Sequence, residues 1–199
     1  MALSGYGYGL QDLTINQEYL GFGRIALVSA TGILPDGTVF NLPHDDLLPQ
    51  ARVIADATLV NQRVYLALPL AHSSVREVNS GLEGECRLQL HRHEVRDLHS
   101  DGGDVVSLEV GRVSLRLMLE SEDRSAYSCL AIARILDVRP EGGVVLDPNF
   151  MPCSLTVAAI PALKRFLDET VGLVAERARG LARRMASPSQ QGVAEVAEF

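Results

Sequence analysis

Residues 32–40, GILPDGTVF, place turn-forming residues between two apolar segments. Pro35 fixes φ at the value needed to start a turn, and Asp36 can accept a hydrogen bond from a nearby backbone N–H group. Gly37 can adopt the positive φ that closes a type I turn with a bulge. This stretch therefore predicts the tip of a β-hairpin.

Short apolar segments of the same kind continue on both sides of this hairpin, from residue 22 to residue 135. Residues 64–68 are continuously apolar, whereas residues 86–93 alternate between apolar and polar, as in a strand with one exposed face. Residues 127–135 are apolar on both faces, which is typical of a covered central strand. Many short strands separated by Gly, Pro, Asp and Asn predict an antiparallel β-sandwich or barrel.

One change of phase interrupts the alternation between residues 106 and 119. Val106, Leu108 and Val110 occupy even-numbered positions, whereas Val113, Leu115, Leu117 and Leu119 occupy odd-numbered ones. Because side chains alternate across a strand, we expect a bulge or a tight turn at residues 111–112 to shift the register.

The pattern changes again after residues 147–152, DPNFMP, where a long helix is expected. Pro161 suits the first turn of a helix, and residues 162–185 contain neither proline nor a β-strand pattern. Several arginines lie near the end of this segment, where their positive charges interact favourably with the negative pole of the helix dipole. Residues 187–192 then break the helix, and residues 193–199 could begin a second one, so we expect either a single C-terminal helix or an αα-hairpin.

The expected helix carries a narrow apolar seam whose residues recur at spacings of three and four, as in a coiled coil. We interpret this seam as an oligomer interface, and its residues are Leu163, Leu167, Val171, Val174, Ala178, Leu181 and Met185. A lone helix of this length is marginal in water, so the seam needs a covering surface. The alternative is that the helix packs back onto its own β-domain, as most amphipathic helices do.

Composition excludes several classes of function. The chain has 199 residues, of which 47% are hydrophobic, enough for one large domain or a domain with an appendage. With 25 acidic and 18 basic residues, its net charge is −7, and it has no basic stripe, so nucleic acid is not expected as a partner. The absence of Trp and the 5% aromatic content disfavour a stacking platform for bases or sugars.

Cysteine spacing and hydropathy indicate a cytoplasmic protein. Cys86, Cys129 and Cys153 are odd in number and widely spaced, which favours reduced, buried thiols over a disulfide framework. The N-terminal residues do not resemble a signal peptide, and no apolar run approaches the roughly 20 residues needed to span a bilayer. We therefore expect no direct membrane insertion.

One cluster of residues could hold a metal ion. His91 and His93 lie on the same face of their expected strand, as zinc ligation would require, and His99 and four acidic residues, Glu94, Asp97, Asp101 and Asp104, follow nearby. Arg92 and Arg96 oppose cation binding there, so we interpret the cluster as a solvated strand face. No nucleophile elbow, phosphate-binding loop or zinc-protease motif is present, so we expect neither catalysis nor a cofactor.

Five stretches, taken in order, resemble the N-terminal part of the TssK family, the baseplate subunits of bacterial type VI secretion systems. They are YGYGL at 6–10, LGFG at 20–23, GILPDGTVF at 32–40, VRDL at 95–98 and LDPNFMP at 146–152. The resemblance covers residues 6–185 and rests on the succession of these stretches. It implies a β-sandwich like the shoulder domain of phage receptor-binding proteins, followed by a helical neck that forms trimers.

The resemblance also implies partners and a domain division. The shoulder, expected at residues 1–152, would dock onto the wedge proteins TssF and TssG, and the neck would occupy residues 153–199. A further head domain would contact the membrane-complex proteins TssL and TssM. The N-terminal motif with Trp and the head are missing from this sequence, so we expect a truncated chain or a shortened homologue. Two other functions stay open from the sequence: a ligand- or glycan-binding β-sandwich, and a metal-dependent hydrolase at His91 and His93.

Overall fold

A computed structural model describes residues 7–54, 59–71, 78–79, 86–96 and 104–186 of the chain. The chain divides into two compact units, Met1–Ile160 and Pro161–Phe199. The first unit contains every described strand, and the second contains helix α2 (Pro161–Ala186). The prediction of a mainly antiparallel β-fold followed by a C-terminal helix is confirmed. The domain boundary expected between residues 152 and 153 stays a prediction.

The hairpin predicted from residues 32–40 is present. Strands β3 (Leu27–Ile33) and β4 (Val39–Leu42) pair in antiparallel fashion, with Ile33 opposite Val39. In the turn, the Gly37 N–H donates to the Leu34 carbonyl at 2.9 Å, and Gly37 has a φ of +85°. The local sequence chemistry thus produces the expected reversal.

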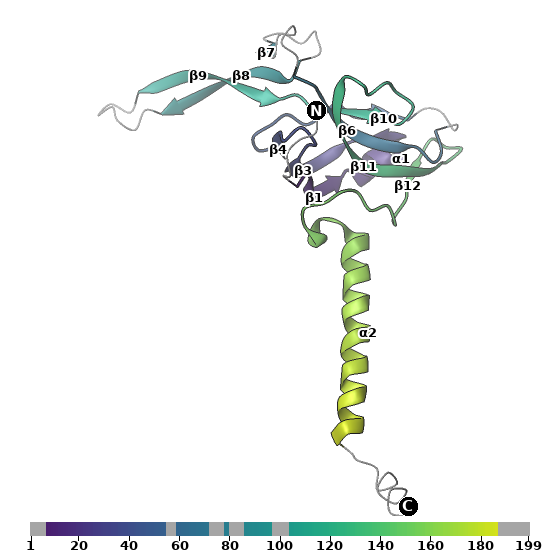
Figure 1. The fold of residues 1–199 in the computed structure, drawn as a ribbon. Coiled ribbons are helices and arrows are strands. Elements are labelled where there is room, and N and C mark those ends of the chain that lie inside the picture. Colours follow the sequence, from purple (N-terminus) through teal and green to yellow (C-terminus); the bar gives the residue numbers. More distant parts are fainter. Residues whose placement is uncertain (1–6, 55–58, 72–77, 80–85, 97–103, 187–199) are drawn as a thin grey trace, which may run out of the picture. The chain divides into compact units, whose positions relative to one another are not determined.

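Two antiparallel sheets form the body of the first unit (Figure 1). In one sheet, β3 lies between β1 (Gly9–Ile15) and β4. The other sheet has four strands, in the order β10 (Arg116–Leu119), β6 (Arg63–Pro69), β11 (Tyr127–Val138) and β12 (Val144–Leu146). The segment predicted to be a covered central strand, 127–135, lies in β11, between β6 and β12.

The deepest core side chains come from both sheets and from the segments that join them. The largest of those with less than 2% exposure are Leu10, Ile25, Leu34, Phe40, Leu42, Ile54, Val64, Leu66, Leu68, Leu130 and Ile135. Nearly all are Leu, Ile or Val, whose burial provides most of the stabilisation of such a fold.

Short elements complete the first unit. They are α1 (Gln17–Gly21), β2 (Arg24–Ile25), β5 (Arg52–Val53), β7 (Val78–Asn79) and the 3₁₀ helix η1 (Val157–Ala159). The Asn16 side chain caps α1 by accepting hydrogen bonds from the N–H groups of Glu18 and Tyr19. Strands β2 and β5 pair with each other.

A long two-stranded ribbon is formed by β8 (Leu88–Arg96) and β9 (Val105–Val113), and β7 runs parallel to the start of β8. The register of the ribbon is regular throughout, with Leu90 opposite Gly111 and Gln89 opposite Arg112. The register shift expected at residues 111–112 is therefore wrong. The apolar residues change from even to odd positions because Val110 lies on an exposed face of the ribbon, whereas Val113 lies on the opposite face and is buried.

Helix α2 contains the whole segment that was predicted to be helical. It begins at Pro161, and Arg183 and Arg184 occupy its last turn, where positive charge favours the helix dipole. The second helix considered for residues 193–199 lies outside the described residues. Within the described part of the chain, no helix combines the length and apolar character needed to cross a membrane.

Candidate interaction surfaces

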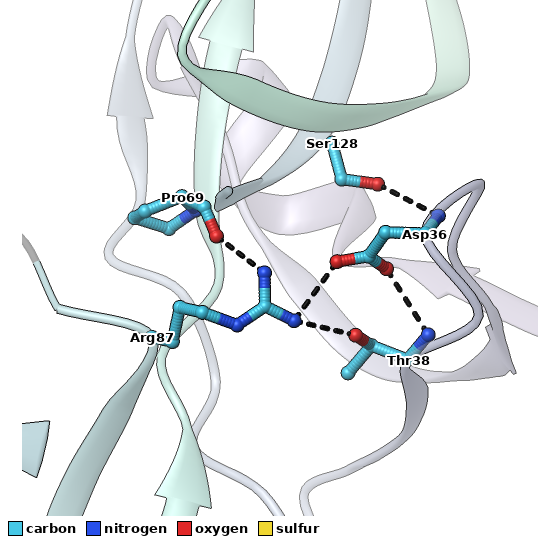
Figure 2. Close-up of polar contacts among 5 residues, drawn as sticks. All are labelled: Asp36, Thr38, Pro69, Arg87 and Ser128. Carbon is cyan, nitrogen blue, oxygen red and sulfur yellow. Dashed lines mark hydrogen bonds and ion pairs between the residues drawn. The ribbon is translucent and has the colours of Figure 1, made fainter. Parts of the chain in front are cut away.

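One arginine joins four segments of the first unit that are far apart in sequence (Figure 2). Arg87 immediately precedes β8, and its Nη2 lies 2.8 Å from Asp36 Oδ2 in the β3–β4 turn. The same Nη2 donates to Thr38 Oγ1 at 2.7 Å, and Nη1 donates to the Pro69 carbonyl at 2.6 Å. The Asp36 N–H in turn donates to Ser128 Oγ of β11 at 3.2 Å. Arg87 therefore fixes the base of the ribbon to the turn and to the four-stranded sheet.

The environment of Asp36 favours its charged form. Burial alone would raise its pKa, but the hydrogen bonds from Thr38 and Arg87, together with the charge of Arg87, outweigh burial. They hold the pKa of the Asp36 carboxyl below its ordinary value. The arrangement satisfies both charges and leaves no group poised for proton transfer, so its role is structural.

A second carboxylate organises the stretch LDPNFMP at residues 146–152. Asp147 Oδ2 accepts a hydrogen bond from Arg134 Nε at 2.9 Å and also contacts Arg134 Nη2, while Asp147 Oδ1 accepts from the Asn149 N–H at 2.9 Å. The hydrogen bonds from Arg134 are the main reason that the pKa of Asp147 is lowered. This motif is thereby fixed to β11 and has a conformational role.

The ribbon of β8 and β9 presents an apolar face to solvent. Residues opposite each other in an antiparallel pair share a face, so His91, His93 and Val95 lie beside Val110, Leu108 and Val106 respectively. The apolar members of this face are between 38% and 48% exposed. A two-stranded ribbon is only marginally stable in water without a covering layer, so this face is a candidate contact surface.

The structure tests the geometry of the suggested metal cluster in part. His91 and His93 do share a face, as the alternation indicated, but Val110 and Leu108 lie opposite them. Within the described residues, no group of three or more His, Cys, Asp or Glu side chains is placed to hold a metal ion. His99, Asp97 and Asp101 lie outside those residues.

The seven seam residues predicted as an oligomer interface all lie on α2. Leu163 is half-buried and the other six are exposed; the five larger ones range from 44% for Leu167 to 84% for Met185. Phe166 and Leu173 are exposed too and were missed. Phe166 directly precedes Leu167, and Leu173 directly precedes Val174, so the two missed residues are seven positions apart. This repeat beside the seam is a signal in the sequence that could have identified them. The apolar stripe is therefore wider on one side than predicted, and its occupant stays a prediction.

All three cysteines lie within the described residues, and all are free thiols. Cys86 and Cys129 are half-buried, while Cys153 is exposed, so the expectation of buried thiols fails for Cys153. The Cys153 thiol donates a hydrogen bond to the Tyr8 carbonyl at 3.3 Å. Burial raises the pKa of the Cys129 thiol, although the charge of Arg124 acts in the opposite direction. A raised pKa disfavours the thiolate, so Cys129 does not have the character of a nucleophile.

Comparison with known proteins gives a consistent result. The family described as "Bacterial Type VI secretion, VC_A0110, EvfL, ImpJ, VasE" matches residues 1–199. A curated relative, the type VI secretion system baseplate component TssK1 of Pseudomonas aeruginosa PAO1, is 34% identical over 195 residues, which are 97% of this chain and 44% of the relative. The chain thus spans less than half the length of that relative.

Solved structures share the fold. A crystal structure of TssK matches with a TM-score of 0.84 and 32% identity, over 100% of this chain and 45% of that one. The TssK-TssF-TssG baseplate subcomplex, determined by cryo-electron microscopy, includes a chain that matches with a TM-score of 0.78 and 24% identity, over 90% of this chain and 60% of that one.

Proposed function

Since this chain belongs to the TssK family of type VI secretion proteins, we propose that it is a structural subunit of the secretion baseplate. Its β-rich unit provides a rigid body that contacts neighbouring baseplate proteins, and its helix joins copies of the chain. The observation that carries this proposal is the family match over all 199 residues, together with 34% identity to a baseplate component. The role requires no catalysis, and it places the protein in the cytoplasm.

We propose TssF and TssG as the neighbours that the β-rich unit contacts. The support is the complex of TssK, TssF and TssG in which a TssK chain has this fold. We assign no residue of this chain to TssL or TssM, because the resemblance places that contact in the head domain of the family.

The trimer is proposed to form through the seam on α2. Six of its seven residues are exposed, and their spacing keeps them on one side of the helix. Burial of these side chains between copies removes apolar surface from water, which is the main source of stability for such bundles.

Light scattering coupled to size-exclusion chromatography tests the oligomer. The wild-type protein is expected to have the mass of a trimer, and Leu167→Glu or Val174→Glu is expected to produce monomers with unchanged far-UV circular dichroism of the β-rich unit. Arg165→Glu is the matched control, because this residue lies on the opposite side of the helix from Leu167. A wild-type monomer at high concentration would contradict the trimer. Co-purification with TssF and TssG tests the baseplate role separately.

A further inference from the structure

A groove of about 540 Å³ runs beside strand β10. Its lining comes from residues 47–52, from residues 114–117, and from Cys86 and Gln89 at the base of the ribbon. Leu47 forms an isolated parallel bridge with Ser114 at one end. At the other end, Arg52 Nη2 lies 2.9 Å from Glu122 Oε1. The segment 47–52 is therefore attached to the β10 side of the sheet at both ends and separated from it between them.

Strand β10 is the edge of the four-stranded sheet, and the described residues contain no strand paired to its outer side. Next to it, the Glu120 N–H donates to the Arg63 carbonyl at 3.0 Å, whereas the Leu119 N–H donates to Glu122 Oε2 at 2.6 Å. Backbone groups of alternate residues point to opposite edges of a strand. Leu117 therefore presents its N–H and carbonyl groups away from β6, on the side of the groove.

The chain's own segment does not complete this edge. Pro49 has no N–H group to donate, and residues 48–51 are in no strand or bridge. Backbone groups at an open strand edge are a template for another strand. Among the residues that the structure describes, no extended main chain therefore fills the groove beside β10.

The polar groups of the groove indicate the character of that piece. Arg52 and Arg116 line the groove, and no acidic residue is part of its lining. Arg52 Nη2 pairs with Glu122 just outside the lining, and Arg116 Nη1 donates to Tyr127 Oη at 3.1 Å. Arg52 Nε is buried and has no acceptor among the described residues. A carbonyl or carboxylate oxygen from an incoming segment would satisfy this donor.

We infer that the groove binds an extended acidic segment of a neighbouring protein, which adds to the edge of β10 as a further strand. The main chain of this segment pairs with the Leu117 N–H and carbonyl groups, its apolar side chains pack over Leu48, and an acidic side chain accepts a hydrogen bond from Arg52 Nε. This mode of recognition obtains affinity from backbone hydrogen bonds and specificity from side-chain pockets. The inference rests on the proposed baseplate function, because it requires a protein neighbour.

Hydrogen exchange resolved to single amides tests the pairing on the whole chain, alone and in complex with co-expressed TssF and TssG. The Leu117 amide is expected to exchange at least tenfold more slowly in the complex than in the free protein. Ala51→Trp fills the groove from its lining and is expected to weaken the complex at least tenfold. Val53→Trp is the matched control, since Val53 is exposed and outside the lining, and it is expected to bind like wild type.

The possible outcomes distinguish a failure of the groove inference from a failure of the proposed baseplate function. A complex that forms without slowing exchange at Leu117 overturns the inference and leaves the baseplate function in place. Protection of Leu117 in the free protein that increases with its concentration also overturns it, because the occupant is then a second copy of this chain. Failure of the wild-type chain to bind TssF and TssG overturns both. If Ala51→Trp does not fold, the exchange measurement on wild type still decides.

Discussion

Arg87 and Asp36 form an ion pair at 2.8 Å in which the two side chains are only 16% and 15% exposed. The pair connects the turn of the β3–β4 hairpin to the base of the β8–β9 ribbon (Figure 2). Its partners Thr38 and Pro69 supply additional acceptors for the guanidinium. A charge pair that is shielded and fully hydrogen-bonded is expensive to break, because removal of one member leaves the other without compensation.

Arg87→Ala is therefore expected to lower the free energy of unfolding by about 2–3 kcal/mol, the cost of leaving a part-buried carboxylate and a carbonyl without their donor. Urea denaturation measures this change. Arg92→Ala is the control, because Arg92 pairs with Glu109 at 3.2 Å on the exposed ribbon and such surface pairs contribute below about 1 kcal/mol. Equal effects of the two substitutions would contradict a special role for Arg87.

The same pair predicts a dependence on pH. The pKa of Asp36 is lower in the folded chain than its ordinary value of about 3.9, so the folded state binds this proton less readily than the unfolded state. The carboxylate therefore contributes stability above its ordinary pKa and loses that contribution as the pH falls through the folded pKa. The difference in unfolding free energy between wild type and Asp36→Asn is expected to be largest near pH 7 and to shrink below about pH 4. A difference that stays constant from pH 7 to pH 3 would show that the charge is not involved.

A glycine in the LGFG stretch predicts a second local effect. Gly23 has a φ of +70°, and a Cβ atom there would lie 2.6 Å from the Gly142 carbonyl oxygen. Gly23→Ala is expected to lower the unfolding free energy by about 2 kcal/mol, through strain and steric overlap. Gly21→Ala provides the control, because among the described residues no heavy atom beyond its chain neighbours and its own helix backbone lies within 4 Å of the added Cβ. Its change in unfolding free energy should stay below about 1 kcal/mol. Thermal denaturation of both variants measures the contrast, and a tolerated Gly23→Ala would be the contradicting result.

Local chemistry explains which parts of the fold could be predicted from the sequence. The β3–β4 hairpin follows from Pro35, Asp36 and Gly37, which act within one turn. Helix α2 follows from Pro161 and from a long segment that contains neither proline nor a strand pattern after it. The contacts of Arg87 could not be predicted, because its partners come from two distant segments, the β3–β4 turn and the end of β6, and no spacing in the sequence links them.

The incorrect register shift at residues 111–112 has a related cause. The predicted shift would have brought the apolar residues before and after residues 111–112 to the same face. The ribbon instead exposes Val106, Leu108 and Val110, and burial begins only at Val113. Alternation indicates which residues share a face, but it does not indicate which face is covered, and that depends on the rest of the fold.

Two valines of β9 test which face of the ribbon is covered. Val113 is 8% exposed and Val110 is 39% exposed, although they lie in one strand and have the same side chain. Val113→Ala is expected to reduce the unfolding free energy by about 2 kcal/mol, from lost burial and the cavity that remains. Val110→Ala should cost less than about 0.5 kcal/mol in the isolated protein, because an exposed methyl group gains little from folding. If the two losses are equal in the isolated protein, the ribbon face that carries Val110 is already covered, and its assignment as a free contact surface is wrong.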